Sequence, residues 1–403
     1  MKIIWILNGY GLDSGAITGG PIRFHAVSSR WQKSHSGLEQ VLVTTSGGEK
    51  VLRSMGCCFP FVRVPSALVF KREPFKAFRI WSYLVTSADA LLFPARLPQG
   101  DVVITVSDYF CDIVPAVVSK RRTSGMRWIA WIHHKERHPT ERPGNRLFNE
   151  ITWRIQEWSF RKIAKYADQA WVLDSDAGDE VAQRLKELGM PQERILKMRN
   201  GIESGPISQS PDRNKTVDVV MIGVRPNKGS LDVVPVWKIV QQVRPGTTLR
   251  LMGGMAGEVN LQKHIKQEGL EKLIEIFKPE NGWVPFDEYL AKVKEARLLF
   301  APSHEEGWGI ALCEAMACGL PVVAYDLPVY RRVYGEALVT VREGDHRGFA
   351  LKICALLDDR EAYESRRLIG FECALRYGWD ALAEQDWSAL ASGRSSAASD
   401  CLR

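Results

Sequence analysis

The sequence contains no uninterrupted apolar segment near the roughly 20 residues that are needed to span a bilayer. At the N-terminus, one Lys is followed by only five apolar residues before Asn8, too few for the apolar region of a signal peptide. These two absences predict a cytoplasmic protein, unless another feature holds it at the inner face of a membrane.

Zinc-ligand spacings and a disulfide framework are also missing. The eight cysteines are scattered, apart from the adjacent pair Cys57 and Cys58. Cys313 and Cys318 flank a helical motif described below, and the favoured interpretation is that both are buried, reduced thiols. No Asp-x-Asp pair follows a strand in a setting suited to holding a metal ion against a diphosphate, so we expect no metal requirement.

The length of 403 residues, with 45% hydrophobic and 25% charged residues, predicts two domains of an ordinary globular protein. The net charge of +7 is unevenly divided, because the first 200 residues hold 29 Lys and Arg against 19 Asp and Glu. The remaining residues hold 25 against 28. The basic first half predicts an anionic partner. Nucleic acid is disfavoured, because no recognition motif accompanies the charge.

The most informative segment is residues 302–326, PSHEEGWGIALCEAMACGLPVVAYD. It follows an apolar run typical of a strand and continues through a loop with Gly307 and Gly309 into a helical pattern. Gly319 and Pro321 end that helix, and a second apolar strand follows. This strand–helix–strand unit predicts a helix N-terminus at the carboxyl end of a parallel sheet, where such sheets bind ligands.

Two carboxylates in this segment, Glu306 in the loop and Glu314 in the helix, are candidates for binding hydroxyl groups. Between them, the backbone N–H groups at the start of the helix predict an anion site. An anion with hydroxyl groups on both sides suits a sugar nucleotide. The alternative is that both carboxylates are solvated surface residues, but the flanking glycines, the helix stop and the following strand disfavour it.

The segment resembles the retaining glycosyltransferases of family 4, whose motif PS-x-x-E-G-x-G followed by E-A-x-A-x-G-x-P-V-V it carries. The resemblance implies the α/β GT-B fold, in which two doubly wound Rossmann-like domains face a cleft. It implies that Glu306 contacts the donor sugar and that Glu314 contacts the ribose. It further implies that backbone groups of four residues hold the donor sugar and diphosphate: Trp308, Gly309, Ile310 and Ala311.

In the first half, Gly9, Gly11 and Gly15 follow the first strand, but their spacing does not fit a dinucleotide-binding fingerprint. Gly19 and Gly20 instead resemble the family's paired-glycine loop, which approaches the donor diphosphate and the acceptor. A flexible loop is the alternative. The resemblance also implies a His near the reactive end of the donor sugar. His133, directly after a buried strand, matches best, with His134 and His138 as weaker candidates and a hydrogen-bonded turn residue as the alternative.

In the second half, a glycine-bounded turn with two cations follows a strand: Gly223, Arg225, Lys228 and Gly229. Relatives neutralise the leaving diphosphate with an Arg and a Lys in this turn. Lys228 and Gly229 match that pattern, whereas Arg225 lies closer to the Lys than in the common form. Two surface cations are the alternative. The loop of residues 278–285 corresponds to the family's base-binding loop, and the identity of the base cannot be read from it.

We expect an acceptor-binding domain at residues 1–203 and a nucleotide-sugar-binding domain at 204–376, with a linker at 203–216. Residues 377–391 should form a helix that crosses back to the first domain, and 392–403 a disordered tail. The expected reaction moves a sugar from a UDP- or GDP-linked donor to a hydroxyl of a glycan or lipid-linked acceptor, in polysaccharide or glycolipid synthesis. The alternatives are an epimerase or phosphorylase of the same fold, or a non-catalytic scaffold subunit.

Basic and aromatic residues gather in two segments of the first half, 70–83 and 120–165. Such a surface suits anionic headgroups or a lipid diphosphate, so we expect an anionic membrane as a partner of this domain. The alternative is a basic domain that only aids solubility.

Overall fold

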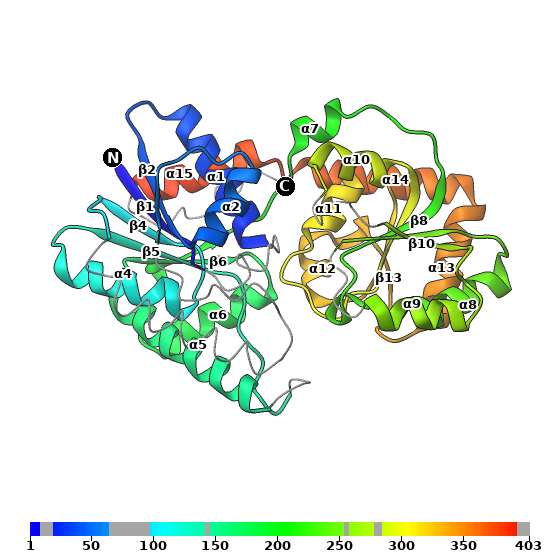
Figure 1. Cartoon of the computed structure of the whole chain (residues 1–403), viewed down its shortest axis with the longest axis horizontal. Coiled ribbons are helices and arrows are strands. Elements are labelled where there is room, and N and C mark those ends of the chain that lie inside the picture. Colours follow the sequence, from blue (N-terminus) through cyan, green and yellow to red (C-terminus); the bar gives the residue numbers. More distant parts are fainter. Residues whose placement is uncertain (9–18, 64–96, 142–145, 254–257, 278–283, 393–403) are drawn as a thin grey trace. The chain divides into compact units, whose positions relative to one another are not determined.

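The computed structural model describes residues 1–8, 19–63, 97–141, 146–253, 258–277 and 284–392. The chain divides into two compact units (Figure 1). The first holds Met1–Arg199 and Asp380–Arg403, and the second holds Asn200–Trp379. The predictions for the first glycine loop, for residues 70–83, for most of the loop 278–285 and for the C-terminal tail lie outside the described residues.

The first unit is built on a parallel sheet with the strand order β3-β2-β1-β4-β5-β6-β7. Its strands are β1 (Lys2–Ile6), β2 (Glu39–Thr44), β3 (Phe61–Arg63), β4 (Val102–Thr105), β5 (Arg127–Ile132), β6 (Gln169–Leu173) and β7 (Ile195–Met198). Its helices are α1 (Gly19–Ser34), α2 (Ser46–Ser54), α4 (Phe110–Arg122), α5 (Arg146–Tyr166), α6 (Asp176–Glu187), the short η2 (Gln192–Arg194) and α15 (Trp379–Ser392).

The strands of this sheet read as continuous apolar runs because side chains on both faces are buried. On one face, Ile4 and Ile6 join a core with α4, α5 and α6. On the other face, Trp5 packs against Trp31 of α1 and Trp131 of β5, with ring centroids 5.6 and 5.4 Å away. The alternation along β1 therefore places Ile4 and Ile6 on one face and Trp5 in an aromatic cluster on the other.

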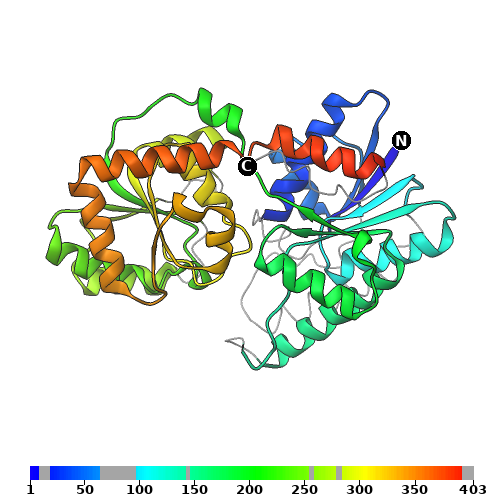
Figure 2. The same cartoon turned by 180° about the vertical axis from the view of Figure 1, so that it is seen from behind.

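Helix α15 follows the second unit in sequence but packs in the first, beside α1 (Figure 2). Arg23 of α1 is fully buried, forms an ion pair with Asp386 of α15, and lies 4.8 Å from the centroid of the Trp131 ring. The indole N–H of Trp31 donates to the carbonyl oxygen of Ala383 at 2.7 Å. A buried charge pair and a buried indole hydrogen bond thus fix this helix to the first unit.

The second unit is a parallel sheet in the order β10-β9-β8-β11-β12-β13. Its strands are β8 (Val217–Ile222), β9 (Leu249–Met252), β10 (Ile274–Phe277), β11 (Ala296–Ala301), β12 (Val322–Tyr325) and β13 (Val339–Val341). Its helices are α7 (Ser204–Gln209), η3 (Pro226–Lys228), α8 (Val233–Val243), α9 (Glu258–Gln267), α10 (Phe286–Lys294), α11 (Ile310–Ala317), α12 (Pro328–Val333), η4 (Gly335–Ala337), α13 (His346–Asp358) and α14 (Arg360–Leu375).

Helices cover both faces of this sheet. One core contains residues of α8, α9 and α13, and the other contains residues of α7, α10, α11, α12 and α14. The linker expected at residues 203–216 is wrong in its first part, because residues 204–209 form α7 and Ile207 is buried in the second core. The Ser, Pro and Gly content of the segment obscured this single apolar anchor.

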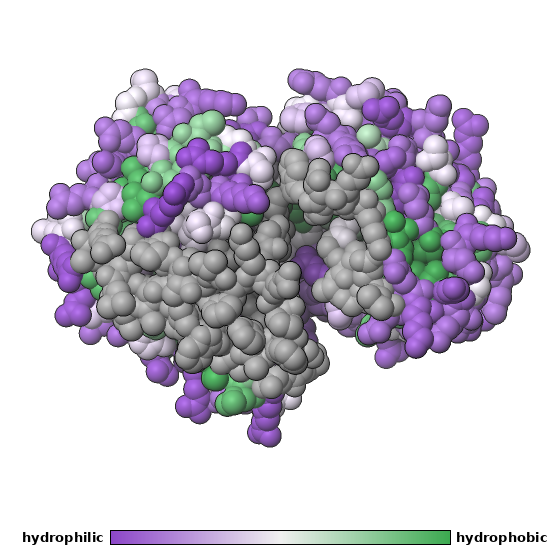
Figure 3. Space-filling model, in the orientation of Figure 1, coloured by the Kyte–Doolittle hydropathy of each residue, from purple (hydrophilic) through white to green (hydrophobic). Residues whose placement is uncertain are grey.

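Hydrophilic residues (purple) cover most of the described surface of the second unit in Figure 3, and hydrophobic residues (green) interrupt them on the right-hand side. Among the helices that the structure describes, none has the length and apolar character needed to cross a membrane.

Candidate functional site

The candidate site of the second unit lies where the strand order reverses. Strands β8 and β11 are neighbours, and successive strands extend from them in opposite directions. The turn that carries Lys228 follows β8, and the loop that carries Glu306 follows β11. Because parallel strands end at the same edge of a sheet, the reversal brings these two segments together, and such positions commonly bind ligands.

Gly229 allows the Lys228 turn to pack directly on the end of β11. Its φ of +79° lies in the left-handed region, and a Cβ at this position would lie 2.1 Å from the carbonyl oxygen of Pro302. Only glycine satisfies both conditions. The glycine that the sequence singled out therefore sets the spacing between the two segments.

We expect Gly229→Ala to destabilise the second unit more than Gly246→Ala. Both positions have φ near +80°, so each variant adopts a left-handed backbone at a cost of about 1–2 kcal/mol. At Gly246 nothing lies within 4 Å of the added Cβ, whereas at Gly229 the turn must move away from Pro302. Thermal unfolding of the two variants measures the difference, and equal melting temperatures would contradict the packing argument.

Lys228 and Glu306 form an ion pair whose side chains are only 18% and 13% exposed. The buried hydroxyl of Tyr330 lies close enough that Glu306 contributes, after burial, to the raised pKa of this tyrosine. A cation and a carboxylate held together at this edge can receive a ligand that offers an anion to one and hydroxyl groups to the other. The structure thus brings together two residues that the sequence placed in one site.

Helix α11 begins at the same loop and directs its N-terminus toward this edge of the sheet. Gly309, with φ +94°, caps the helix, and a Cβ there would lie 3.1 Å from the Tyr330 ring. The hydroxyl of Tyr334 donates to the carbonyl oxygen of Gly309 at 2.9 Å and so holds the cap in place. The backbone N–H groups at the helix start, at Ile310 and Ala311, are where the helix dipole favours an anion.

The Trp308 side chain belongs to the core rather than to an open site. It is 2% exposed and packs edge-to-face on Tyr334 and Tyr377, with centroids 5.5 and 5.1 Å away. Any contact of this residue with a ligand must therefore come from its backbone.

Glu314, inside α11, accepts a hydrogen bond of 2.7 Å from the hydroxyl of Tyr289 on α10. Burial raises the pKa of Glu314 to about 7, although the hydrogen bond from Tyr289 opposes the rise. The carboxyl group therefore changes charge near neutral pH, unlike an exposed glutamate with a pKa of about 4.3.

We expect the affinity for a nucleoside diphosphate sugar to rise as the pH increases through about 7, because only the ionised Glu314 accepts hydrogen bonds from two hydroxyl groups. Glu314→Gln should remove this pH-dependent rise in affinity, and Tyr289→Phe should move the rise to higher pH. The same group should oppose folding as the pH rises, since its charged form is disfavoured in the folded state. Calorimetric titrations above and below neutrality measure the rise in affinity, and a flat affinity profile in the parent would contradict it.

Arg225 lies at the exposed start of the Lys228 turn, and its carbonyl oxygen accepts hydrogen bonds from the amides of Lys228 and Ser230. Gly223, with φ +83°, directly follows β8, and its Cβ position would lie 3.8 Å from Cγ of Lys228. Both residues therefore belong to the same turn, with Arg225 on its exposed side.

In the first unit, the structure brings Gly20 and His133 together. Gly19 and Gly20 begin α1, and a Cβ on Gly20 would lie 3.2 Å from Nε2 of His133. Nε2 lies 2.9 Å from the carbonyl oxygen of Val106, which can only accept, so Nε2 carries the proton. Burial lowers the pKa of His133 to about 4, and the imidazole is therefore neutral at physiological pH. His134 and His138 instead contact Glu136 and Thr140.

Several polar contacts near these sites were not predicted. Asp112 accepts hydrogen bonds from the amide of Asn8 and the hydroxyl of Ser107, and burial raises its pKa to about 7. The sequence signal for these contacts is that Asn8 and Ser107, both polar, come shortly after the adjacent strands β1 and β4.

His304 lies within the segment of residues 302–326, but the residues that it contacts are distant in sequence. Among the described residues, no group of three or more potential ligands is arranged to hold a metal ion.

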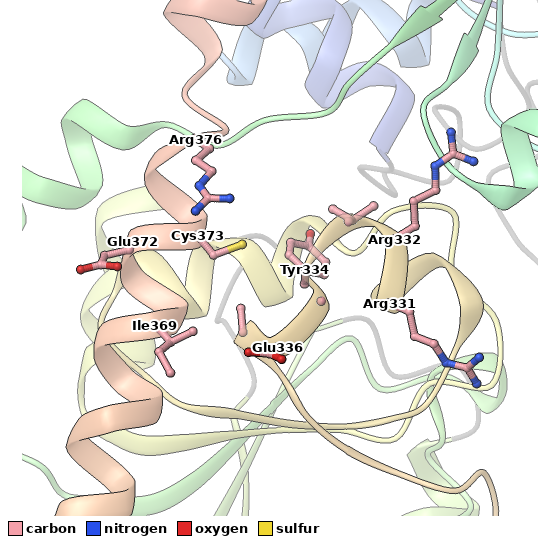
Figure 4. A pocket seen from close by; sticks show the side chains of 11 residues that line it. Arg331, Arg332, Tyr334, Glu336, Ile369, Glu372, Cys373 and Arg376 are labelled. Atoms are coloured by element: carbon pink, nitrogen blue, oxygen red, sulfur yellow. The ribbon is translucent and has the colours of Figure 1, made fainter. Parts of the chain in front are cut away.

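Separately, an open pocket of about 360 Å³ lies between α14 and the segment of α12 and η4 (Figure 4). Arg331 and Arg332 extend away from Tyr334, and Arg331 pairs with Asp326. Arg376 lies beside α14 above Cys373. None of the predicted site residues lines this pocket.

Comparison with known proteins adds a family match. Residues 207–369 match the model of the glycosyl transferases group 1 family. Phosphatidyl-myo-inositol mannosyltransferase of Mycobacterium leprae is 40% identical over 98 residues, which cover 24% of this chain and 26% of that protein. The putative colanic acid biosynthesis glycosyltransferase WcaL of Escherichia coli is 28% identical over 152 residues, 36% of each chain. The matches thus span well under two thirds of these relatives.

Among solved structures, HepE of Anabaena in complex with UDP and glucose superposes with a TM-score of 0.69. The two chains are 15% identical, and the superposition covers 97% of this chain and 100% of the other. Together with the two parallel sheets, this likeness confirms the predicted GT-B fold.

Proposed function

We propose that this chain, a GT-B protein with a glycosyl transferases group 1 domain at residues 207–369, is a retaining glycosyltransferase of family 4. The donor is a UDP- or GDP-linked sugar, and the acceptor is a hydroxyl of a glycan or a lipid-linked glycan. The observation that carries the proposal is the Lys228–Glu306 pair at the reversal of strand order, beside the N-terminus of α11. The names of the relatives, which refer to phosphatidylinositol and colanic acid, support this class of acceptor.

In the proposed reaction, the bond between the anomeric carbon and the diphosphate oxygen breaks, and a bond to the acceptor oxygen forms on the same face. The proton of the acceptor hydroxyl leaves with the nucleoside diphosphate. Lys228 and the amides of Ile310 and Ala311 stabilise the charge that develops on the diphosphate, and Arg225 adds to it from the exposed side of the turn. Glu306 orients the sugar and Glu314 binds the ribose.

We assign His133 and Gly20 of the first unit to the same reaction. As a neutral imidazole, His133 serves as a hydrogen-bonding group rather than as a cation. The proposal invokes no metal ion, since the cations of the turn and the helix dipole supply positive charge. Activity that persists in EDTA would support this part, and activity that depends on a divalent cation would overturn it.

The test begins with thermal-shift measurements against UDP- and GDP-linked sugars, followed by transfer assays with the best donor. Glu314→Ala should chiefly weaken nucleotide binding, by about 10- to 150-fold, the effect of losing hydrogen bonds to a charged group. Glu306→Ala should chiefly lower turnover through misplacement of the sugar. Variants that bind and turn over like the parent would overturn both assignments.

The two alternatives make different predictions. An epimerase would produce a new free sugar nucleotide from the donor alone, without an acceptor. A scaffold subunit would not bind the donor at all. Incubation of the protein with donor only, followed by chromatography of the nucleotide sugars, identifies an epimerase, and the thermal-shift measurements with the donor identify a scaffold subunit.

Association of the basic first unit with an anionic membrane is a further proposal. In residues 120–165, Lys120 pairs with Asp168 and Arg154 pairs with Glu150, so part of the positive charge is neutralised within the unit. Sedimentation with liposomes tests it: recovery should rise with anionic lipid and fall with salt. Equal recovery with neutral and anionic vesicles would contradict it.

A further inference from the structure

Two histidines share one buried carboxylate beside the candidate donor site. Nε2 of His304 lies 2.6 Å from Oδ2 of Asp232, and Nε2 of His346 lies 2.7 Å from Oδ1 of the same residue. The Asp232 side chain is only 10% exposed. Nδ1 of His304 lies 2.6 Å from Oε1 of Glu343. The four side chains form a chain of contacts, which we call the histidine–carboxylate chain: Glu343, His304, Asp232 and His346.

The geometry fixes the charge of His304. Carboxylate oxygens only accept hydrogen bonds, and both ring nitrogens of His304 lie within hydrogen-bond distance of one. Both nitrogens must therefore donate, which only the imidazolium can do. Burial opposes this charge, but the hydrogen bonds to Glu343 and Asp232 outweigh it and raise the pKa of His304.

The histidine–carboxylate chain connects the two segments of the donor site. Asp232 follows the Lys228 turn, and its amide donates to the carbonyl oxygen of Gly229 at 3.0 Å. His304 lies two residues before Glu306, and its amide donates to the carbonyl oxygen of Asn227 at 3.1 Å. The side-chain contact between Asp232 and His304 thus closes a loop of interactions around Lys228 and Glu306.

We propose that Asp232, His304 and His346 are positioning residues that hold the Lys228 turn and the Glu306 loop at their donor-binding spacing. The imidazolium of His304 is the group that joins the two segments. The role of these residues in donor binding rests on the proposed function, whereas the histidine–carboxylate chain itself does not.

The inference predicts a loss of order at high pH. When His304 loses its proton, one of its two contacts loses its donor, and Asp232 and Glu343 are no longer separated by a cation. Because the pKa of His304 is raised in the folded protein, its stabilising contribution is present at low pH and is lost as the pH rises through that pKa. The other titratable groups that face the ring or share its loop are Tyr325, whose ring centroid lies 5.3 Å away, His346, Asp345, Glu305 and Glu306.

The decisive measurement is NMR of the ¹⁵N-labelled histidines in the nucleotide-free protein, with His304→Gln to assign the signal. We expect both ring nitrogens of His304 to be protonated well above the usual His pKa of about 6.5. Asp232→Asn should lower that pKa and speed amide hydrogen exchange in residues 225–230 and 303–309 by about tenfold or more. Glu268→Gln is the matched control, since it removes a carboxylate from the exposed Lys238–Glu268 pair of the same unit.

Glu343→Gln alters only the outer contact, at a 52% exposed side chain, and should lower the pKa of His304 by less. It keeps the test decisive if Asp232→Asn does not fold. A parent in which His304 titrates at or below about 6.5 would overturn the inference. Unchanged exchange in both segments of a folded Asp232→Asn variant would also overturn it.

Binding of UDP and GDP separates this inference from the proposed function. For the better of the two, we expect the affinity of the parent to fall when His304 loses its proton at high pH, and Asp232→Asn should raise Kd about tenfold and abolish that fall. If neither nucleotide binds the parent, the proposed function fails, while the NMR and exchange results still test whether the histidine–carboxylate chain holds the two segments together. If binding occurs but the pH profile of Asp232→Asn matches the parent, the positioning role fails.

Discussion

Lys228→Ala is expected to lower turnover by about 100- to 1,000-fold, the effect of removing a preorganised group that faces developing charge. The cation is held beside Glu306 by the Gly229 turn, and in the proposed reaction it faces the diphosphate, whereas the sugar is contacted by Glu306. The loss should therefore appear in kcat more than in the selectivity between donor sugars. Steady-state kinetics with two donors that differ only in the sugar measure both quantities.

Lys238→Ala is the matched control, because Lys238 is an exposed lysine of the same unit that also pairs with a glutamate. It should retain parental kinetics. Thermal unfolding of Lys228→Ala should show a cooperative transition, which would exclude loss of the fold as the cause. Full activity of Lys228→Ala would remove the electrostatic basis of the proposed mechanism, and a smaller effect at Arg225→Ala is expected from its exposure.

Asp386→Ala is expected to lower the free energy of unfolding of the first unit by about 3–5 kcal/mol, because it removes a buried carboxylate that pairs with the buried guanidinium of Arg23. Asp380→Ala is the control, since it removes the partner of Arg30 at a 79% exposed position. An exposed pair of this kind contributes about 0.2–1 kcal/mol. Urea unfolding followed by tryptophan fluorescence measures the difference.

A double variant, Arg23→Met with Asp386→Leu, tests the cause. Replacement of both charges by apolar side chains of similar size should recover most of the lost stability, because no unpaired charge remains. Equal destabilisation by Asp386→Ala and Asp380→Ala would show that the buried pair is not what holds α15. Since the chain has two units, the transitions are assigned to each unit before free energies are compared.

Much of the second unit could be predicted from local sequence. The apolar run at Val217–Ile222 is β8, and the glycine, helix and proline pattern around Glu314 is α11 with its flanking strands. These features depend on backbone preferences that a short segment determines by itself. Lys228 and Glu306, which are 78 residues apart, were assigned to one site because the family resemblance implies a donor contact for each.

The partners of these residues could not be predicted in the same way. Tyr289 lies on a different helix from Glu314, and His304 is separated from Asp232 by 72 residues. His346 is 114 residues from Asp232. No local pattern marks such contacts, because they follow from the packing of helices on the sheet. The short strands β3 and β13, with three residues each, were missed because they are too short for a period to show.

The position of α15 has a consequence for synthesis on the ribosome. The segment that completes the first unit is made after the whole of the second unit, because α15 follows that unit in sequence. Arg23 and its partner Asp386 are therefore 363 residues apart. At about 5–20 residues per second, the residues between the two parts of the first unit take roughly 10–40 s to translate. During that interval the second unit is being synthesised, and Trp31 and Arg23 lack their partners on α15. The first unit, although it is synthesised first, thus reaches its final packing only after α15 has been made.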